Sequence, residues 1–241
     1  MNAISSFGSY GSSYNFLMSS FQRASSGKKI NSAADDAANL AISQKLQSQS
    51  NQYSASIRNT LDEQSLANVK DGALQNVTSN LQSMRQLALQ ASNGTYSAED
   101  KSIIQRQINA VKDTISNIYS STQYNGMSVF SNDEYSKLGI DDFDVTGDFD
   151  LQKIDDALNS LSSSRSDIGS SYNAMEAYIN YASNANLNTI SALSRMEDAD
   201  LAEEAMNIAQ GKVLSAVQIS LQKTQLNLMK TSSLNLLNML A

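Results

Sequence analysis

Two neighbouring carboxylates near the start of the chain have the type and spacing of an acid–base pair. Asp35 and Asp36 lie within the stretch "SSGKKINSAADDAANLAISQKL" (25–46). Paired carboxylates transfer protons when one of them holds a proton that the other has lost. Successive residues of a helix point about 100° apart, however, so their carboxyl groups seldom share a proton. No further acid or base is placed to complete a site, so we expect this stretch to connect structural elements and not to catalyse a reaction.

A second acidic stretch, "DFDVTGDFDLQK" (142–153), imitates the spacing of a calcium-binding loop. Oxygen-bearing side chains alternate along it and a glycine takes the sixth position, as in calcium loops. The residues concerned are Asp142, Asp144, Thr146, Gly147, Asp148 and Asp150. The twelfth position, which requires a bidentate glutamate, is Lys153, and the flanks have the pattern of strands. We therefore interpret the stretch as the solvated face of a hairpin and expect no metal site.

The composition excludes several classes of function. The 241 residues include no cysteine, histidine, tryptophan or proline. Without cysteine and histidine there is no ordinary zinc, iron–sulfur or haem site, no thiol nucleophile and no imidazole base, so we expect neither an enzyme nor a cofactor. The net charge of −7 argues against a nucleic-acid partner. No run of about 18 apolar residues predicts a membrane span, and the first residues lack the features of a conventional secretory signal.

Two heptad patterns predict a pair of antiparallel helices in the first half of the chain. Apolar residues of the first recur at alternating steps of three and four. This first stripe consists of Leu74, Val77, Leu81 and Met84. The stretch "SNGTYSAED" (92–100) then breaks the helix with an Asn-Gly turn, and Ser97 resembles the N-cap of a new helix. The second stripe consists of Ile104, Ile108, Val111 and Ile115. Two such helices joined by a short turn are expected to pack against each other.

The period of the pattern then changes and later returns to that of a helix. Between 131 and 151, aromatic and β-branched residues alternate with Asp, Thr and Gly, which predicts a β-hairpin that turns near Gly147. A third helical stripe follows, with one arginine interrupting it. Its apolar members are Ile154, Leu158, Leu161 and Ile168. The three stripes together predict one helical bundle.

Both ends of the chain carry apolar residues without a matching core elsewhere in the sequence. The first 30 residues are rich in Ser, Gly, Asn and Tyr, and two glycines make them a poor helix on their own. In the last part, apolar residues cover a wide arc, as if the helix touched neighbours on several sides. The predicted assembly core is Leu214, Val217, Leu221, Leu228, Leu236, Leu237 and Leu240. We expect both ends to be marginal alone and to become ordered when many copies assemble.

Several long motifs resemble the bacterial flagellin family. "RASSGKKINSAADDAANLAISQKL" is similar to the N-terminal flagellin signature, and "DGALQNVTSNLQSMRQLALQASNGTYSAEDKSIIQRQI" and "TQYNGMSVF" continue it. "QKIDDALNSLSSSRSDIGSSYNAMEAYINY", "SRMEDADLAEEA" and "SSLNLLNML" are similar to the C-terminal flagellin region. The motifs follow one another in the order of the family and cover nearly the whole chain from Ser25 on.

The resemblance implies a structural subunit that polymerises with itself into the flagellar filament used for motility. In the family, both chain ends form a coiled coil lining the inner tube, a helical bundle with a small hairpin forms the next layer, and a variable outer region is inserted between the halves. Only about 20 residues (131–150) separate the halves here, so we expect a minimal form without the outer domains. The resemblance further implies type III export to the outside of the cell. The partners it implies are a flagellar export chaperone and the hook-associated and cap proteins.

The predicted fold is mainly α, a long antiparallel helical bundle or coiled coil with a small β-hairpin region and terminal helices that form a coiled-coil core between subunits. The predicted parts are an N-terminal inner-core segment (1–30), a connector (31–46), the bundle (47–182, with the hairpin at about 131–151), and a C-terminal connector with the inner-core helix (183–241). The connector is the stretch that contains the two neighbouring aspartates.

The resemblance also implies a surface for a host Toll-like receptor, on "LQSMRQLALQ" and the following helix. Leu87 and Gln90 match the pattern of that surface. Ser83 stands where many receptor-activating members have arginine, and Gln107 where they have glutamate. A serine does not replace the bidentate contact of an arginine, so weak receptor activation is expected.

Other functions stay open at the level of the sequence. A hook–filament junction protein shares the terminal pattern of flagellin. A soluble module that binds a host receptor or a mucosal surface would be a well-folded monomer with an exposed site, whereas the apolar ends predict frayed termini. An enzyme is the weakest alternative, because the sequence offers no set of nucleophile, base and metal ligands.

Overall fold

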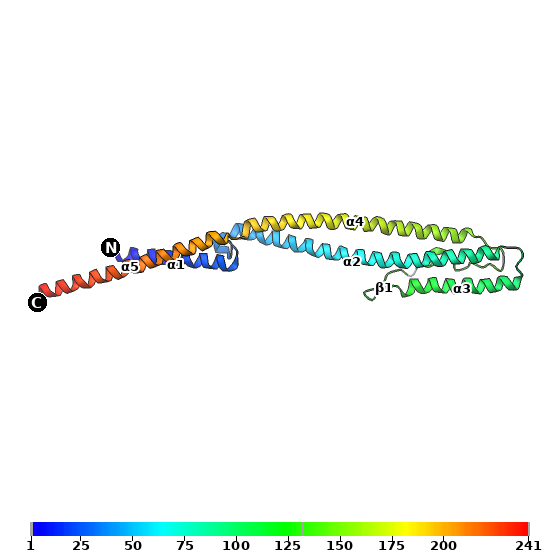
Figure 1. Cartoon of the computed structure of the whole chain (residues 1–241), viewed down its shortest axis with the longest axis horizontal. Coiled ribbons are helices and arrows are strands. Elements are labelled where there is room, and N and C mark those ends of the chain that lie inside the picture. Colours follow the sequence, from blue (N-terminus) through cyan, green and yellow to red (C-terminus); the bar gives the residue numbers. More distant parts are fainter. Residues whose placement is uncertain (1, 132, 241) are drawn as a thin grey trace. The chain divides into compact units, whose positions relative to one another are not determined.

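The structure is a computed structural model that describes the backbone of residues 2–131 and 133–240, and the side chains of residues 11–131 and 133–234. Its long helices are α1 (Asn2–Ser26), α2 (Ala33–Ala91), α3 (Ala98–Ser121), α4 (Gln152–Glu197) and α5 (Leu201–Leu240) (Figure 1). The strands β1 (Gln123–Tyr124) and β2 (Met127–Ser128) and the short 3-10 helix η1 (Ser136–Leu138) complete the elements of the described residues. The predicted mainly helical fold class with a small antiparallel sheet is confirmed.

The chain divides into two compact units. The terminal unit comprises Met1–Gln52 and Ala185–Ala241, and the central unit comprises Tyr53–Asn184. Two helices, α2 and α4, contribute residues to both units, because the division falls within each of them, after Gln52 and before Ala185. Within the described residues, no helix has both the length and the apolar character that a bilayer span requires.

The core of the central unit lies between α2, α3 and α4, and α3 begins with a well-formed N-cap. The hydroxyl of Ser97 accepts a hydrogen bond from the backbone N–H of Asp100 at 3.2 Å, and the Asp100 carboxylate accepts one from the Ser97 N–H at 3.0 Å. This reciprocal capping box satisfies two backbone donors at the helix start. It therefore fixes the point from which α3 packs its apolar stripe against α2.

The predicted β-hairpin at 131–151 is wrong. The antiparallel sheet lies earlier, where Gln123 pairs with Ser128 and Tyr124 with Met127. The connecting residues, Asn125 and Gly126, both have positive φ angles, of 50° and 77°, as a two-residue turn between strands requires. The described residues of 131–151 form turns and η1 but no strand. The alternating pattern arises because Ile140, Phe143 and Val145 of an irregular loop are inserted into the core, together with Leu138.

The terminal unit pairs α1 with α5, which lie side by side (Figure 1). Contacts between the end of α1 and the start of α5, and between the middle of each, show that the two helices run antiparallel. The first residues were expected to be a poor helix on their own, and α5 supplies the partner that this helix needs. Packing against another helix contributes most of the stability of helices with weak propensity.

Candidate assembly surfaces

The contact between α1 and α5 is made mostly by small and polar residues, with Leu17 as a large apolar member. Arg23 Nη1 lies 3.2 Å from the buried carboxylate oxygen Oε1 of Glu204. Gln218 Nε2 donates a hydrogen bond to Ser13 Oγ at 2.9 Å. Between these two contacts Gly211 faces Leu17 so closely that a Cβ atom at position 211 would lie 3.2 Å from the Leu17 Cβ. Sequence reasoning missed this contact, because the apolar stripes, not the small and polar residues, were taken as the packing surface.

The large apolar side chains of α5 point away from that contact. Among the predicted assembly-core residues, Leu214, Val217, Leu221 and Leu228 are 41–63% exposed. Further exposed members on the same helix are Met206, Val213, Ile219, Leu226, Met229 and Leu234. The predicted positions Leu236, Leu237 and Leu240 have side chains outside the described residues. Exposed apolar surface on this scale is typical of surfaces that make protein–protein or membrane contacts.

Helix α1 also exposes large apolar side chains. Tyr14, Phe16, Met18 and Phe21 are each between 39% and 49% exposed. Phe21 has a partial partner, since the Lys212 ammonium of α5 lies 5.6 Å from its ring centroid. Both helices of the pair therefore carry apolar surface on the sides that do not face each other.

A short antiparallel bridge fastens the residues after α1 to the residues before α5. The Lys29 N–H donates to the Glu197 carbonyl at 2.5 Å, and the Ala199 N–H donates to the Gly27 carbonyl at 2.9 Å. Gly27 has a φ of +68°, in the region that favours glycine. The Lys28 ammonium pairs with the Glu197 carboxylate at 2.8 Å, and this contact together with the Ser43 hydroxyl lowers the pKa of Glu197. The bridge thus holds the end of α1 next to the start of α5.

Asp35 and Asp36 each hold a different part of the backbone at the start of α2. The Asp35 carboxylate accepts hydrogen bonds from the N–H groups of Asn31 and Ser32, at 3.0 and 2.8 Å. Asp36 has an extended backbone, with φ −164° and ψ 97°, and accepts from the N–H of Asn39 at 2.9 Å as the N-cap of the helix that follows. These hydrogen bonds lower the pKa of both carboxyls, so both are charged at neutral pH. Neither is poised to hold a proton for catalysis.

The predicted bundle stripes lie in the central unit, and nine of their twelve residues are buried there. The buried ones are Leu74, Val77, Leu81, Met84, Ile104, Ile108, Ile115, Ile154 and Leu161. The other three, Val111, Leu158 and Ile168, are partly buried against the same cluster. Arg165, which interrupts the third stripe, forms a bidentate pair with Asp71 at 2.7 and 3.2 Å and lowers the pKa of that carboxyl. The interrupting arginine was the one signal in the sequence for this pair.

Three of the four carboxylates of the calcium-like stretch bind protein groups. Asp142 pairs with the Lys153 ammonium at 2.8 Å, Asp144 accepts from the N–H and the hydroxyl of Thr146, and Asp150 accepts from the N–H of Gln152. Lys153 therefore places a positive charge at the position where a calcium loop needs a glutamate. Within the described residues, no three His, Cys, Asp or Glu side chains are grouped as metal ligands.

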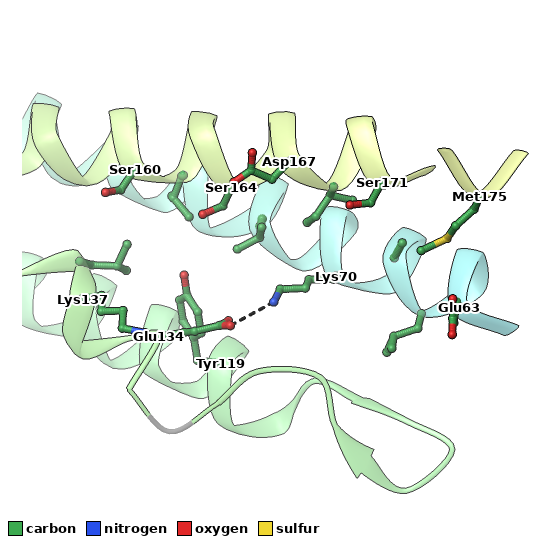
Figure 2. A pocket seen from close by; sticks show the side chains of 16 residues that line it. Glu63, Lys70, Tyr119, Glu134, Lys137, Ser160, Ser164, Asp167, Ser171 and Met175 are labelled. Atoms are coloured by element: carbon green, nitrogen blue, oxygen red, sulfur yellow. Dashed lines mark hydrogen bonds and ion pairs between the residues drawn. The ribbon is translucent and has the colours of Figure 1, made fainter. Parts of the chain in front are cut away.

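The central unit also contains a cavity of 540 Å³ between α2, α4 and the segment that leads into η1 (Figure 2). Figure 2 shows the Lys70 ammonium directed at Glu134, whose carboxylate lies 3.1 Å away. Tyr119 lines the same cavity, and burial, with a smaller contribution from the Glu134 charge, raises its pKa to about 12. The lysine forms an ion pair with Glu134 and the tyrosine stays protonated at neutral pH, so neither of these two groups is a free nucleophile.

Comparison with known families decides what these surfaces belong to. The model of the bacterial flagellin N-terminal helical region matches residues 1–134, and the model of the bacterial flagellin C-terminal helical region matches residues 151–237. The chain belongs to the bacterial flagellin family. Only residues 135–150 lie between the two flagellin matches, and in the structure these residues form η1 and the irregular loop.

Individual flagellins resemble the chain over most of its length. A flagellin of Salmonella montevideo is 34% identical over 229 residues, which cover 90% of this chain and 45% of that protein. A flagellin of Salmonella berta is 37% identical over 180 residues, 70% of this chain and 35% of that protein. This flagellin chain thus spans less than half the length of these curated relatives. None of these matches favours a hook–filament junction protein.

A solved flagellin structure was also found. It is the crystal structure of Bacillus cereus flagellin, which is 24% identical and aligns with a TM-score of 0.45 over 52% of this chain and 88% of that chain. The family assignment rests on the two matched terminal regions.

The positions of the implied receptor surface lie on α2 and α3 of this flagellin. Leu87 is partly buried against the core, and Gln90 is exposed and donates to the Tyr96 hydroxyl at 3.0 Å. Ser83 is exposed and its hydroxyl donates to the carbonyl of Ser79, while Gln107 is exposed on α3. At both positions that depart from the family pattern, Ser83 and Gln107, the exposed side chain is therefore uncharged.

Proposed function

We propose that this chain is a structural subunit that polymerises into the bacterial flagellar filament. The observation that carries the proposal is the exposed apolar surface of α1 and α5 in a chain of the flagellin family. Full burial of one Leu, Val or Phe side chain contributes about 1.5–3 kcal/mol, so even partial burial of ten such residues between copies would drive association.

Assembly is proposed to proceed by coupled folding of the two chain ends. A helix pair held by small and polar contacts contributes little stability of its own, because polar contacts are exchanged for contacts with water when the pair opens. Burial of the outward apolar faces against other copies then supplies the missing free energy. The terminal helices would thus be marginal in the monomer and ordered in the polymer.

The proposed location is the extracellular flagellum, reached through type III export. An apolar helix such as α5 needs a cover before assembly, and an export chaperone is the proposed cover. Hook-associated and cap proteins are the proposed partners at the two ends of the polymer. Family membership supports these proposed partners, and the exposed apolar side chains of α5 support the chaperone in particular.

Electron microscopy of the purified chain after salt-induced polymerisation tests the proposed function. Filaments are expected from the intact chain. Limited proteolysis of the dilute monomer should first remove about the first 30 and the last 40 residues, and the trimmed product should no longer polymerise. A monomer that resists proteolysis at both ends and forms no filament in any salt would contradict the proposal.

We further propose that this flagellin activates the host Toll-like receptor weakly. Serine at position 83 offers neither the charge nor the reach of an arginine, and Gln107 carries no charge for a cationic partner. An NF-κB reporter assay should therefore show a weak response, which the double variant S83R/Q107E increases at least about tenfold. The single variant S79R, at an exposed position one helical turn earlier on α2, is the matched control. A wild-type response as strong as that of a potent flagellin would refute this proposal.

A further inference from the structure

The pair of helices in the terminal unit is packed in an unusual way. Helix pairs in water usually bury their apolar stripes against each other and leave polar residues outside. Here the facing positions hold an ion pair, an amide–hydroxyl hydrogen bond and a glycine that packs on Leu17, while most of the other large apolar side chains described on the two helices are exposed. An explanation is needed for an arrangement that gives up the stability of an apolar contact.

We propose that the contacts Arg23–Glu204, Leu17–Gly211 and Ser13–Gln218 act together with the neighbouring backbone bridge between residues 27–29 and 197–199 to set the register of α1 against α5 within one chain. The inference rests on the proposed function, because it concerns which faces the pair presents to other copies. The three contacts are spread along the helix pair, one toward its connector end and the others successively nearer the chain ends. Together they favour one register over the others, since polar groups at the contact of two helices select one register at a cost in stability.

Each contact penalises a slipped register for a different physical reason. The Glu204 side chain is only 7% exposed, so a slip that removes Arg23 leaves a buried carboxylate without its cation. Gly211 permits an approach in which a Cβ would meet Leu17 Cδ1 at 3.0 Å, and a slip of one heptad would bring Gln218 to face Leu17 instead. The Ser13–Gln218 hydrogen bond is lost in the same slip. An apolar heptad contact would lack this selectivity, because one leucine replaces another when the helices slide.

Engineered cysteine pairs test the register, since the chain has no cysteine of its own. The pair L17C/G211C reports the observed register, because the Cβ separation of 3.2 Å needs only a small adjustment to reach disulfide geometry. The pair A24C/G211C reports a slip of one heptad and shares the same α5 substitution. In dilute monomer under mild oxidation, we expect intramolecular cross-linking of L17C/G211C to be at least about tenfold faster, which corresponds to a preference of about 1.4 kcal/mol. Equal rates for the two pairs would overturn the proposal.

A charge swap tests whether the ion pair contributes to the selection. Adding R23E to both cysteine pairs should reduce the ratio of their cross-linking rates at least about threefold, and E204R added to R23E should restore it. K223E, at an exposed lysine of α5, is the matched control and should leave the ratio unchanged. An R23E variant with an unchanged ratio would contradict the role of the ion pair. Polymerisation is measured separately, so a chain that keeps its register preference but forms no filaments counts against the proposed function alone.

Discussion

The side-chain amide of Gln105 bonds to two backbone groups of the irregular loop that follows η1. Its Oε1 accepts a hydrogen bond from the Val145 N–H at 2.8 Å, and its Nε2 donates to the Phe143 carbonyl at 3.3 Å. The Lys112 ammonium adds a hydrogen bond to the Asp141 carbonyl at 2.8 Å. Buried backbone groups need partners, and a neighbouring strand is the usual source. On this loop, side chains of α3 provide the partners instead, which allows the loop to enter the core without a sheet.

Replacing Gln105 by leucine should destabilise the central unit by about 1–3 kcal/mol, because the Val145 N–H is then buried without a partner. Urea unfolding followed by circular dichroism measures the loss. Q107L, an exposed position on the same helix, is the control and should change stability by less than about 0.5 kcal/mol. Equal stabilities of Q105L and Q107L would show that the amide does not hold the loop.

The hydrogen bonds to Asp35 make the stability of the connector depend on pH. The N–H of Asn31 contributes most to the lowered pKa of this carboxyl, followed by the N–H and the hydroxyl of Ser32. A lowered folded-state pKa adds stability that is present above the ordinary value of 3.8 and is lost as the pH falls through the lower folded-state value. The difference in stability between wild type and D35A should therefore be largest near pH 6 and should shrink toward about pH 2.5. Urea unfolding of both proteins between about pH 2.5 and pH 6 measures this difference in stability. The variant D148A, which changes an exposed aspartate, is the control. A difference that is the same at both ends of the range would contradict the prediction.

At the scale of the helices, α3 and α5 show how differently apolar residues can be used. In α3 the apolar residues lie on one face and are buried, at Ile104, Ile108 and Ile115. In α5 they spread over a wide arc beyond the side that faces α1, and most of the described ones remain exposed in the single chain. A helix with apolar residues all round needs several neighbours. Helix α1 is one such neighbour, and we propose that other copies of the chain supply the remaining neighbours of α5.

Replacing Leu221 by lysine should separate assembly from folding. The side chain is 63% exposed, so the monomer should lose less than about 0.5 kcal/mol. A lysine placed in a surface that other copies cover should raise the critical concentration for polymerisation at least about tenfold. Sedimentation of polymer after salt addition measures this concentration, and K223Q on the same helix serves as control. Polymerisation of L221K at the wild-type concentration would indicate that this face of α5 is not covered in the polymer.

The helices that bury apolar residues on a single face were predictable from the sequence. The stripe from Leu74 to Met84 follows a strict heptad, and the Asn-Gly turn with the Ser97 cap marks where the next helix begins. The hairpin was misplaced because Phe143 and Val145 alternate with polar residues as in a strand, whereas the true strands have only two residues each, too few to show an alternation. The α1–α5 contact was not predicted, because its α5 members Glu204, Gly211 and Gln218 recur every seven residues but are charged, small or polar, whereas the heptads were searched for among apolar residues.

Across the whole molecule, the two units bury residues of different chemistry. The fully buried large side chains of the central unit are apolar, with Leu81, Met84, Ile108 and Phe143 among them. In the described part of the terminal unit, the buried residues are mostly polar. The polar ones are Ser20, Ser43, Ser50, Thr189, Glu197 and Glu204, and the others are Gly211 and the apolar Ile30. Burial of apolar area is the main source of stability, so the central unit should hold most of the folding free energy.

Hydrogen exchange of the full-length monomer, read by mass spectrometry, should therefore resolve two levels of protection. Amides of α3 and of residues 74–91 in α2 should exchange only through global unfolding, whereas amides of α1 and α5 should exchange through local opening, at least about a hundredfold faster. The same measurement on the polymer is the decisive comparison, because covering the apolar faces should bring α1 and α5 close to the protection of α3. If α1 and α5 were already as protected as α3 in the dilute monomer, their apolar faces would not need other copies. The link between the polar helix contact and assembly would then fail.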